Sequence, residues 1–132
     1  MTSDLMTIRQ MCDTFNVTPR TLRFYEAKEL LFPERHGQKR LFTKRDRARL
    51  KLILRGKRFG FSLETIRQWL ELYSVGDGQM TQLTLWIEHA RAQMDTLREQ
   101  RDELEDAMGE LQDLIDVAER DLTTRSTAKA AE

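Results

Sequence analysis

An uninterrupted seven-residue repeat between Met80 and Leu122 restricts the fold of this chain more than any other feature. A helix over these residues would be about 64 Å long, and its narrow apolar stripe is longer than a small domain can cover. The sequence therefore predicts a dimerisation helix that pairs with a second copy, the alternative being that the helix packs back on its own domain. The predicted interface has Met80, Ile87, Met94, Arg101, Met108, Ile115 and Leu122 at its a positions and Leu83, Ala90, Leu97, Leu104, Leu111 and Ala118 at its d positions.

The interface residues favour an antiparallel pair of helices. In a parallel pair, Arg101 would face its own symmetry mate and Ala90 would face Ala90, which combines charge repulsion with a cavity. In an antiparallel pair whose facing residue numbers sum to about 205, Ala90 meets Ile115 and Arg101 faces Leu104. A register summing to about 198 is almost as acceptable, so the orientation is better specified than the register.

The neutral net charge conceals two halves of opposite sign. Residues 1–73 hold 16 basic and 8 acidic residues, a net charge of +8, and residues 74–132 hold 6 basic and 14 acidic residues, a net charge of −8. The first half attracts polyanions and the second repels them. The alternative interpretation is a solvated, salt-bridged helical surface with no polyanionic partner.

Two short helices joined by a tight turn are predicted near the start of the chain. The first shows one apolar stripe, formed by Ile8, Met11, Cys12 and Phe15. It is expected to end near Asn16, and Thr18 followed by Pro19 is typical of the cap and first residue of a second helix. Arg20 and Arg23 share a face of that second helix, which can enter a major groove.

A small hairpin and two further helices are predicted next. Residues 30–33 and 40–42 favour two short strands around a turn at Gly37. Thr43 and Ser62 are expected to cap a third and a fourth helix. The hairpin would form a basic wing that contacts phosphates, through Arg35, His36, Lys39 and Arg40.

Several of these segments, in this order, resemble the winged helix-turn-helix of MerR-family transcriptional regulators. They are TPRTLRFYE at residues 18–26, Leu-Leu at 30–31 with Pro33, RLFT at 40–43 and FGFSLETI at 59–66. The hairpin departs from the family pattern, because its loop is one residue shorter and Lys39 stands where an aromatic residue commonly precedes the arginine. The resemblance implies DNA contacts from the recognition helix, the wing and a second wing: Thr18, Arg20, Thr21, Arg23, Tyr25 (to a phosphate), Arg35, Lys39, Arg40 and Arg58.

Some of these residues also have a structural interpretation. Phe24 and Tyr25 are alternatively core aromatic residues, and Arg23 is positioned three residues before Glu26, where the two side chains can pair within the helix. For Arg20 the sequence offers no comparable structural role, so it is the best-supported DNA contact of this helix.

The predicted fold class is mostly α, with a winged helix-turn-helix domain followed by a long antiparallel coiled-coil dimerisation helix. The expected divisions are a DNA-binding domain at 1–73, a linker at 74–79, the coiled coil at 80–122 and a flexible tail at 123–132. With so short a tail we expect no large effector domain. The absence of a long apolar run or signal peptide predicts a soluble, cytoplasmic protein with no membrane partner.

The sequence predicts a homodimeric transcriptional regulator that binds an inverted repeat in promoter DNA. The resemblance implies that it distorts the promoter spacer and so acts on RNA polymerase indirectly. Alternatives are an architectural DNA-binding protein of low sequence specificity and a coiled-coil adaptor; no pattern typical of an enzyme appears. A single cysteine, Cys12, and two histidines, His36 and His89, predict no metal and no cofactor. A small-molecule effector stays an open question.

Overall fold

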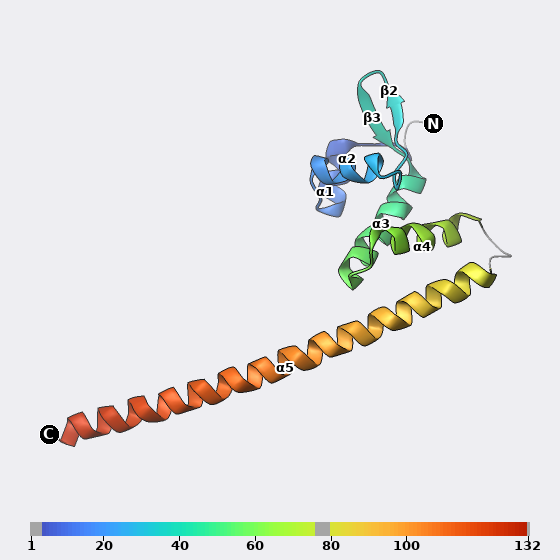
Figure 1. Cartoon of the computed structure of the whole chain (residues 1–132). Helices are drawn as coiled ribbons and strands as arrows, with labels where there is room; N and C mark the ends of the chain where they lie inside the picture. The colour runs from blue at the N-terminus through green and yellow to red at the C-terminus, as the bar shows by residue number, and fades with distance from the viewer. Residues whose placement is uncertain (1–3, 76–79, 132) are drawn as a thin grey trace. The chain divides into compact units, whose positions relative to one another are not determined.

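The computed structural model of the protein describes residues 4–75 and 80–131. The chain divides into two compact units, Met1–Ala90 and Arg91–Glu132. Helices dominate, and the first unit also holds a small antiparallel sheet (Figure 1). The predicted fold class, a winged helix-turn-helix followed by a long C-terminal helix, is confirmed. In chain order the elements are β1 (Met6–Thr7), α1 (Ile8–Phe15), α2 (Pro19–Ala27), β2 (Glu34–His36), β3 (Lys39–Phe42), α3 (Lys44–Phe59), α4 (Leu63–Val75) and α5 (Met80–Ala131).

Side-chain caps set the boundaries of the first helices, as the sequence predicts. Asn16 ends α1 in the left-handed conformation, with φ of 56°, and the Thr18 hydroxyl accepts a hydrogen bond from the Thr21 amide at the start of α2. Thr43 begins α3 with a reciprocal capping box that involves Asp46. These caps fix the turn between α1 and α2, and with it the direction in which α2 projects.

The sheet has the order β1-β3-β2, and both strand pairs are antiparallel. The hairpin predicted around Gly37 is present, but the prediction of its first strand at residues 30–33 is wrong, because that strand is β2 at Glu34–His36. The Leu30 carbonyl instead accepts a hydrogen bond from Arg49 Nε at 2.7 Å, and the Phe32 amide donates one to Asp46 Oδ1 at 2.9 Å. The backbone of this segment is thus bound to α3 rather than to a neighbouring strand.

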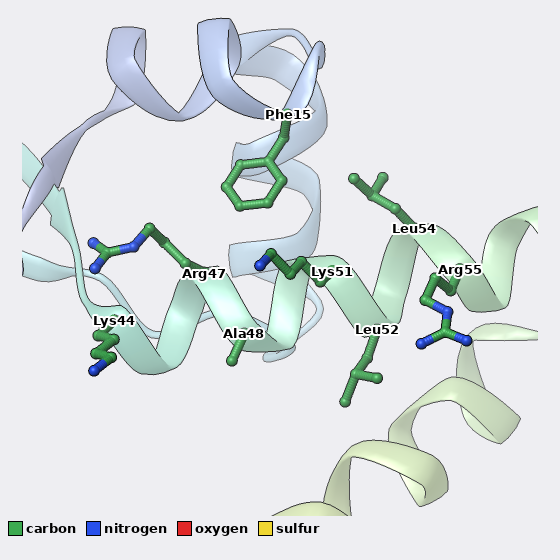
Figure 2. Close-up of a pocket in the computed structure, with 8 residues that line it drawn as sticks. All are labelled: Phe15, Lys44, Arg47, Ala48, Lys51, Leu52, Leu54 and Arg55. Carbon is green, nitrogen blue, oxygen red and sulfur yellow. The ribbon is translucent and has the colours of Figure 1, made fainter.

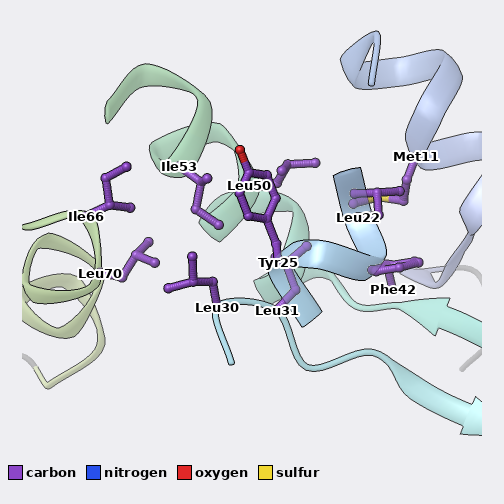
Figure 3. Close-up of a cluster of buried hydrophobic side chains, with 10 residues drawn as sticks. All are labelled: Met11, Leu22, Tyr25, Leu30, Leu31, Phe42, Leu50, Ile53, Ile66 and Leu70. Carbon is purple, nitrogen blue, oxygen red and sulfur yellow. The ribbon is translucent and has the colours of Figure 1, made fainter. Parts of the chain in front are cut away.

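One hydrophobic core holds the sheet and α1 to α4 together (Figure 3). Leu30 and Leu31 belong to it, which explains why their segment reads as a strand in the sequence although it forms an ordered loop. Gly56 lies where α3 approaches α4, and a Cβ atom there would be 2.6 Å from Ile66 Cγ1. The fully or nearly buried members of the core are Met11, Leu22, Tyr25, Leu30, Leu31, Phe42, Leu50, Ile53, Ile66 and Leu70.

The long helix α5 begins at Met80, as predicted, but continues to Ala131. The predicted helix end at Leu122 is therefore wrong, and residues 123–131, expected as a flexible tail, are helical. They contain alanine, lysine and arginine, which favour helix, and Arg125 pairs with Asp121 one turn earlier at 3.1 Å. Of the predicted linker, residues 74–75 belong to α4 and residues 76–79 lie outside the described residues. Within the described ranges no helix is long and apolar enough to span a membrane.

Candidate nucleic-acid interface

Two arginines on α2 form the centre of the candidate interface. Arg20 and Arg23 are both exposed, and within residues 4–75 and 80–131 neither is paired with a carboxylate. Arg23 does not take up the pairing with Glu26 that its spacing allows, because Glu26 binds two other arginines. The second helix of the turn therefore presents two guanidinium groups that are available to bases or phosphates.

The N-terminus of α2 adds a second source of positive potential. The Thr18 and Thr21 hydroxyl groups lie 2.9 Å apart, and the Thr18 oxygen also accepts a hydrogen bond from the Thr21 amide at 3.1 Å. The first amides of a helix carry partial positive charge and attract phosphate oxygens. Thr18 is exposed and Thr21 is half-buried, so Thr18 is the better placed of the two to meet a phosphate.

The two aromatic residues of α2 differ in burial. A phosphate contact by Tyr25 would require an exposed tyrosine, but Tyr25 is buried and Phe24 is exposed. Tyr25 is only 4% exposed, and this burial raises the pKa of its hydroxyl, whereas Phe24 is 45% exposed. The two rings lie 5.7 Å apart, and the Lys28 ammonium sits 5.7 Å from the centre of the Phe24 ring. The structure thus places Tyr25 in the core, as its structural alternative predicted, and leaves Phe24 on the surface.

Glu26 links the β2–β3 hairpin, the predicted wing, to α2. Its carboxylate accepts from Arg40 Nε at 2.7 Å and pairs with Arg35 at 3.3 Å. Arg40 is largely occupied by this contact, while Arg35 keeps a side chain that is 58% exposed. Lys39 is exposed, and none of the described carboxylates pairs with it. Of the three predicted wing contacts, Arg35 and Lys39 remain accessible and Arg40 acts mainly as an anchor.

The role of Glu26 is a feature that sequence reasoning missed. The two partners follow Glu26 by nine and by fourteen residues and lie on β2 and β3, so no helical spacing indicates either contact. A similar long-range contact joins Arg67 of α4 to the Lys28 carbonyl at 2.6 Å. The Glu26 ion pairs and the Arg67 hydrogen bond together anchor the segment between α2 and the wing.

The second predicted wing lies at the end of α3. Arg58 is exposed there in the last helical turn beside Lys57, and Gly60 ends the helix with a φ of 83°. Phe59 and Phe61 pack edge to face across this turn at 5.9 Å. The turn is therefore cationic and accessible, which is compatible with the predicted phosphate contact. Among the described residues no cluster of histidine, cysteine and carboxylate side chains is suited to hold a metal ion.

A second candidate surface runs along α5. The predicted heptad positions lie on this one helix, and many of their large apolar side chains are exposed in the single chain. Arg101, the polar exception, is paired with the neighbouring Asp102 at 3.2 Å. Exposed members of the stripe are Met80, Leu83, Ile87, Met94, Leu97, Leu104, Met108, Leu111, Ile115 and Leu122.

The fold and these surfaces define a winged helix-turn-helix protein with a long helix at its C-terminal end. Comparison with protein-family models matches residues 6–72, just over half of the chain, to the MerR HTH family regulatory protein model, and residues 47–114 to the MerR DNA-binding model. The chain therefore belongs to the MerR family.

Individual relatives agree with this membership. The chain is 39% identical over 67 residues to the HTH-type transcriptional regulator ZntR of Escherichia coli strain K12, and equally to that of strain O157:H7. The match covers 49% of this chain and 48% of ZntR, so the chain spans about half the length of the curated relatives it matches.

Two solved structures share the fold. One is HiNmlR, described as a MerR-family regulator lacking the sensor domain and bound to promoter DNA, with a TM-score of 0.59 over 79% of this chain and 78% of that one. The other is a MerR-family transcriptional regulator from Bacillus cereus, with a TM-score of 0.63 over 80% and 75%. Both are 24% identical to this chain.

Proposed function

We propose that this protein is a DNA-binding transcriptional regulator that acts as a homodimer. The observation that carries the proposal is the pair of exposed guanidinium groups of Arg20 and Arg23, without carboxylate partners in the described chain, on the second helix of a helix-turn-helix. Their setting in a half of the chain with a net charge of +8 supports attraction to duplex phosphates. ZntR, with which the chain shares this region, is itself a transcriptional regulator.

The dimer is proposed from the exposed stripe of α5. A monomeric soluble protein rarely exposes so long an apolar stripe, and burying side chains such as Leu97 and Ile115 against a second copy removes them from water. An antiparallel pairing lets Arg101 face Leu104 of the other copy instead of a second arginine. The acidic surface of the coil would remain away from the DNA, because like charges repel it from phosphates.

The dimer symmetry determines the form of the DNA site. An antiparallel coil carries the two recognition helices at its opposite ends, so the half-sites form an inverted repeat. Their centres are separated by whole helical turns, and two turns, about 68 Å, match the length of the coil best. Distortion of the promoter spacer by such a dimer would align the elements that RNA polymerase reads, which makes the polymerase an indirect partner.

The direct test measures oligomeric state and duplex binding on the full chain. Sedimentation equilibrium is expected to give a dimer, and fluorescence anisotropy with a random-sequence duplex at low ionic strength is expected to show binding that weakens steeply as salt is added. A stable monomer, or no binding to any duplex at low salt, contradicts the proposal. A specificity ratio below about 10³ on selected sites would favour an architectural DNA-binding protein instead.

A further inference from the structure

Helix α2 exposes an aromatic ring that the proposed DNA contacts do not use. Phe24 is 45% exposed, and within residues 4–75 only Phe24 and Phe32 are large apolar side chains with this degree of exposure. The other aromatic residue of α2, Tyr25, is buried among the core side chains (Figure 3). The Phe24 ring is thus a surface feature of α2 and not a member of the core.

Phe24 lies on the same face of α2 as Arg20 and Arg23. At about 100° per residue, Phe24 is offset from Arg20 by roughly 40° around the helix axis, and Ala27 lies between the two arginines. These four side chains are exposed, whereas Leu22 points into the core. The exposed face of α2 therefore combines two guanidinium groups with an aromatic ring and a methyl group.

Two contacts hold the Phe24 ring in its exposed position. Its centre lies 5.7 Å from the centre of the Tyr25 ring, with an angle of 56° between the ring planes, and the Lys28 ammonium lies 5.7 Å from the Phe24 ring centre. Both kinds of contact are favourable and restrict the motion of the ring. A side chain that is already ordered loses less conformational entropy when it meets a ligand.

The cations of α3 have apolar neighbours of a different kind. Those that line the groove between α1 and α3 are Lys44, Arg47, Lys51 and Arg55 (Figure 2). Leu52 and Leu54 project from opposite sides of α3, and both leucines and Phe15 pack against the hydrophobic core. Because these apolar side chains already serve the core, the combination of cations with an available aromatic ring is a property of α2.

We propose that Phe24 recognises thymine in the major groove by contacting its C5-methyl group. This inference rests on the proposed function. The thymine methyl is the apolar group that base pairs present in that groove, and apolar side chains such as phenylalanine and alanine contact it. A phenyl ring has no donor for a phosphate oxygen, so contacts to phosphates or to guanine fall to Arg20 and Arg23. Phe24 is thus a specificity-determining residue of the α2 surface.

The test replaces thymine by uracil, which removes only the C5-methyl group. A binding site is first selected from random duplexes with the full-length chain, and each thymine of that site is then replaced singly in synthetic duplexes. Exposure of one formerly buried methyl group corresponds to a loss of affinity of about fourfold. We expect fluorescence anisotropy to show this loss at the contacted thymine of each half-site.

Variants of the chain show whether the Phe24 ring causes the preference for thymine. Phe24→Ala is expected to bind the thymine and uracil duplexes equally, and Phe24→Leu, which keeps an apolar side chain, to retain a preference for thymine. Arg20→Ala should weaken binding to both duplexes but keep the preference of about fourfold. Arg91→Ala, an exposed position on α5, should change neither quantity. Circular dichroism melts check that all variants fold.

Two outcomes would overturn this inference alone. Equal affinity of the unmodified chain for thymine and uracil at every position would show that no methyl group is contacted. If uracil weakens binding of the unmodified chain and of Phe24→Ala to the same extent, the methyl group acts through the shape of the duplex and not through the ring. Both outcomes leave sequence-specific DNA binding intact, whereas a chain that selects no sequence would overturn the proposed function as well.

Discussion

At the residue scale, the proposed DNA interface consists of side chains that other parts of the protein leave unpaired. Arg20 and Arg23 are exposed without carboxylate partners in the described chain, whereas the Arg40 guanidinium is bound to Glu26. This difference in pairing separates the proposed contacts to DNA from the contact that positions the wing. Substitution of Arg20 or Arg23 is therefore expected to affect DNA affinity directly, and substitution of Arg40 to affect the position of the wing.

Arg20→Ala and Arg23→Ala are each expected to weaken duplex binding by about tenfold or more while leaving the melting temperature unchanged. A substitution that removes a phosphate-binding cation also lowers the slope of log Kd against log salt by about one for each phosphate that is no longer neutralised. Fluorescence anisotropy across a salt series measures both effects. Arg91→Ala, an exposed cation on α5, is the matched control. Unchanged affinity in both α2 variants would contradict the assignment of α2 as the recognition helix.

Cys12 gives a prediction about pH. Burial against the core raises the pKa of its thiol, and the neighbouring Asp13 carboxylate adds to this shift. Because the thiolate is the reactive form, alkylation by iodoacetamide should reach its half-maximal rate at a higher pH in the folded protein than in urea. The raised pKa also makes stability depend on pH. The protonated thiol stabilises the fold at pH values below its unfolded pKa, and this contribution is lost as the pH rises through the folded pKa. Equal alkylation profiles in the two states would contradict the expected shift.

At the element scale, local signals in the sequence predicted the helices, and long-range contacts explain the errors. The caps at Asn16, Thr18 and Thr43 act on backbone groups close to them in the chain, so their sequences determine the helix starts and ends. The segment around Leu30 has the composition of a strand but is bound to Arg49 and Asp46 of α3, which local patterns do not encode. Strand β1 has only two residues, too few for any pattern.

The candidate site was predictable to a similar extent. The exposed positions of Arg20, Arg23, Lys39 and Arg58 follow from helix and hairpin geometry. The sequence leaves the burial of Tyr25 as one of two alternatives, because a tyrosine beside a phenylalanine on a short helix does not indicate which ring faces the core.

The contact between α3 and α4 leads to a paired prediction on two glycines. Gly56→Ala would bring a methyl group to 2.6 Å from Ile66 Cγ1, and the resulting overpacking is expected to destabilise the fold by about 1–3 kcal/mol. Gly109→Ala in α5 meets nothing within 4 Å, and alanine favours helix over glycine by about 1 kcal/mol. Urea denaturation should therefore show opposite signs for the two substitutions. A stabilising Gly56→Ala would contradict the close approach of the two helices.

At the scale of the whole molecule, the orientation of the proposed coil would decide how a dimer presents its two DNA-binding units. The test uses single cysteines introduced on α5 in a Cys12→Ser background. In an antiparallel dimer, a cysteine at position 90 lies far from the same position of the other copy. Ala90→Cys mixed with Ile115→Cys should then form a disulfide-linked heterodimer if facing residue numbers sum to about 205, and Ala90→Cys mixed with Met108→Cys should do so if they sum to about 198. Non-reducing gel electrophoresis reads the result. Cross-linking of Ala90→Cys with itself would show a parallel coil.

In the proposed complex, two copies read two oppositely oriented half-sites on one duplex. Selection of bound fragments from a random duplex library, followed by footprinting of the enriched sequence, tests this arrangement. We predict an inverted repeat whose half-site centres lie about two helical turns apart, protected symmetrically by one dimer. Enrichment of a single asymmetric half-site, or of no sequence at all, would contradict it.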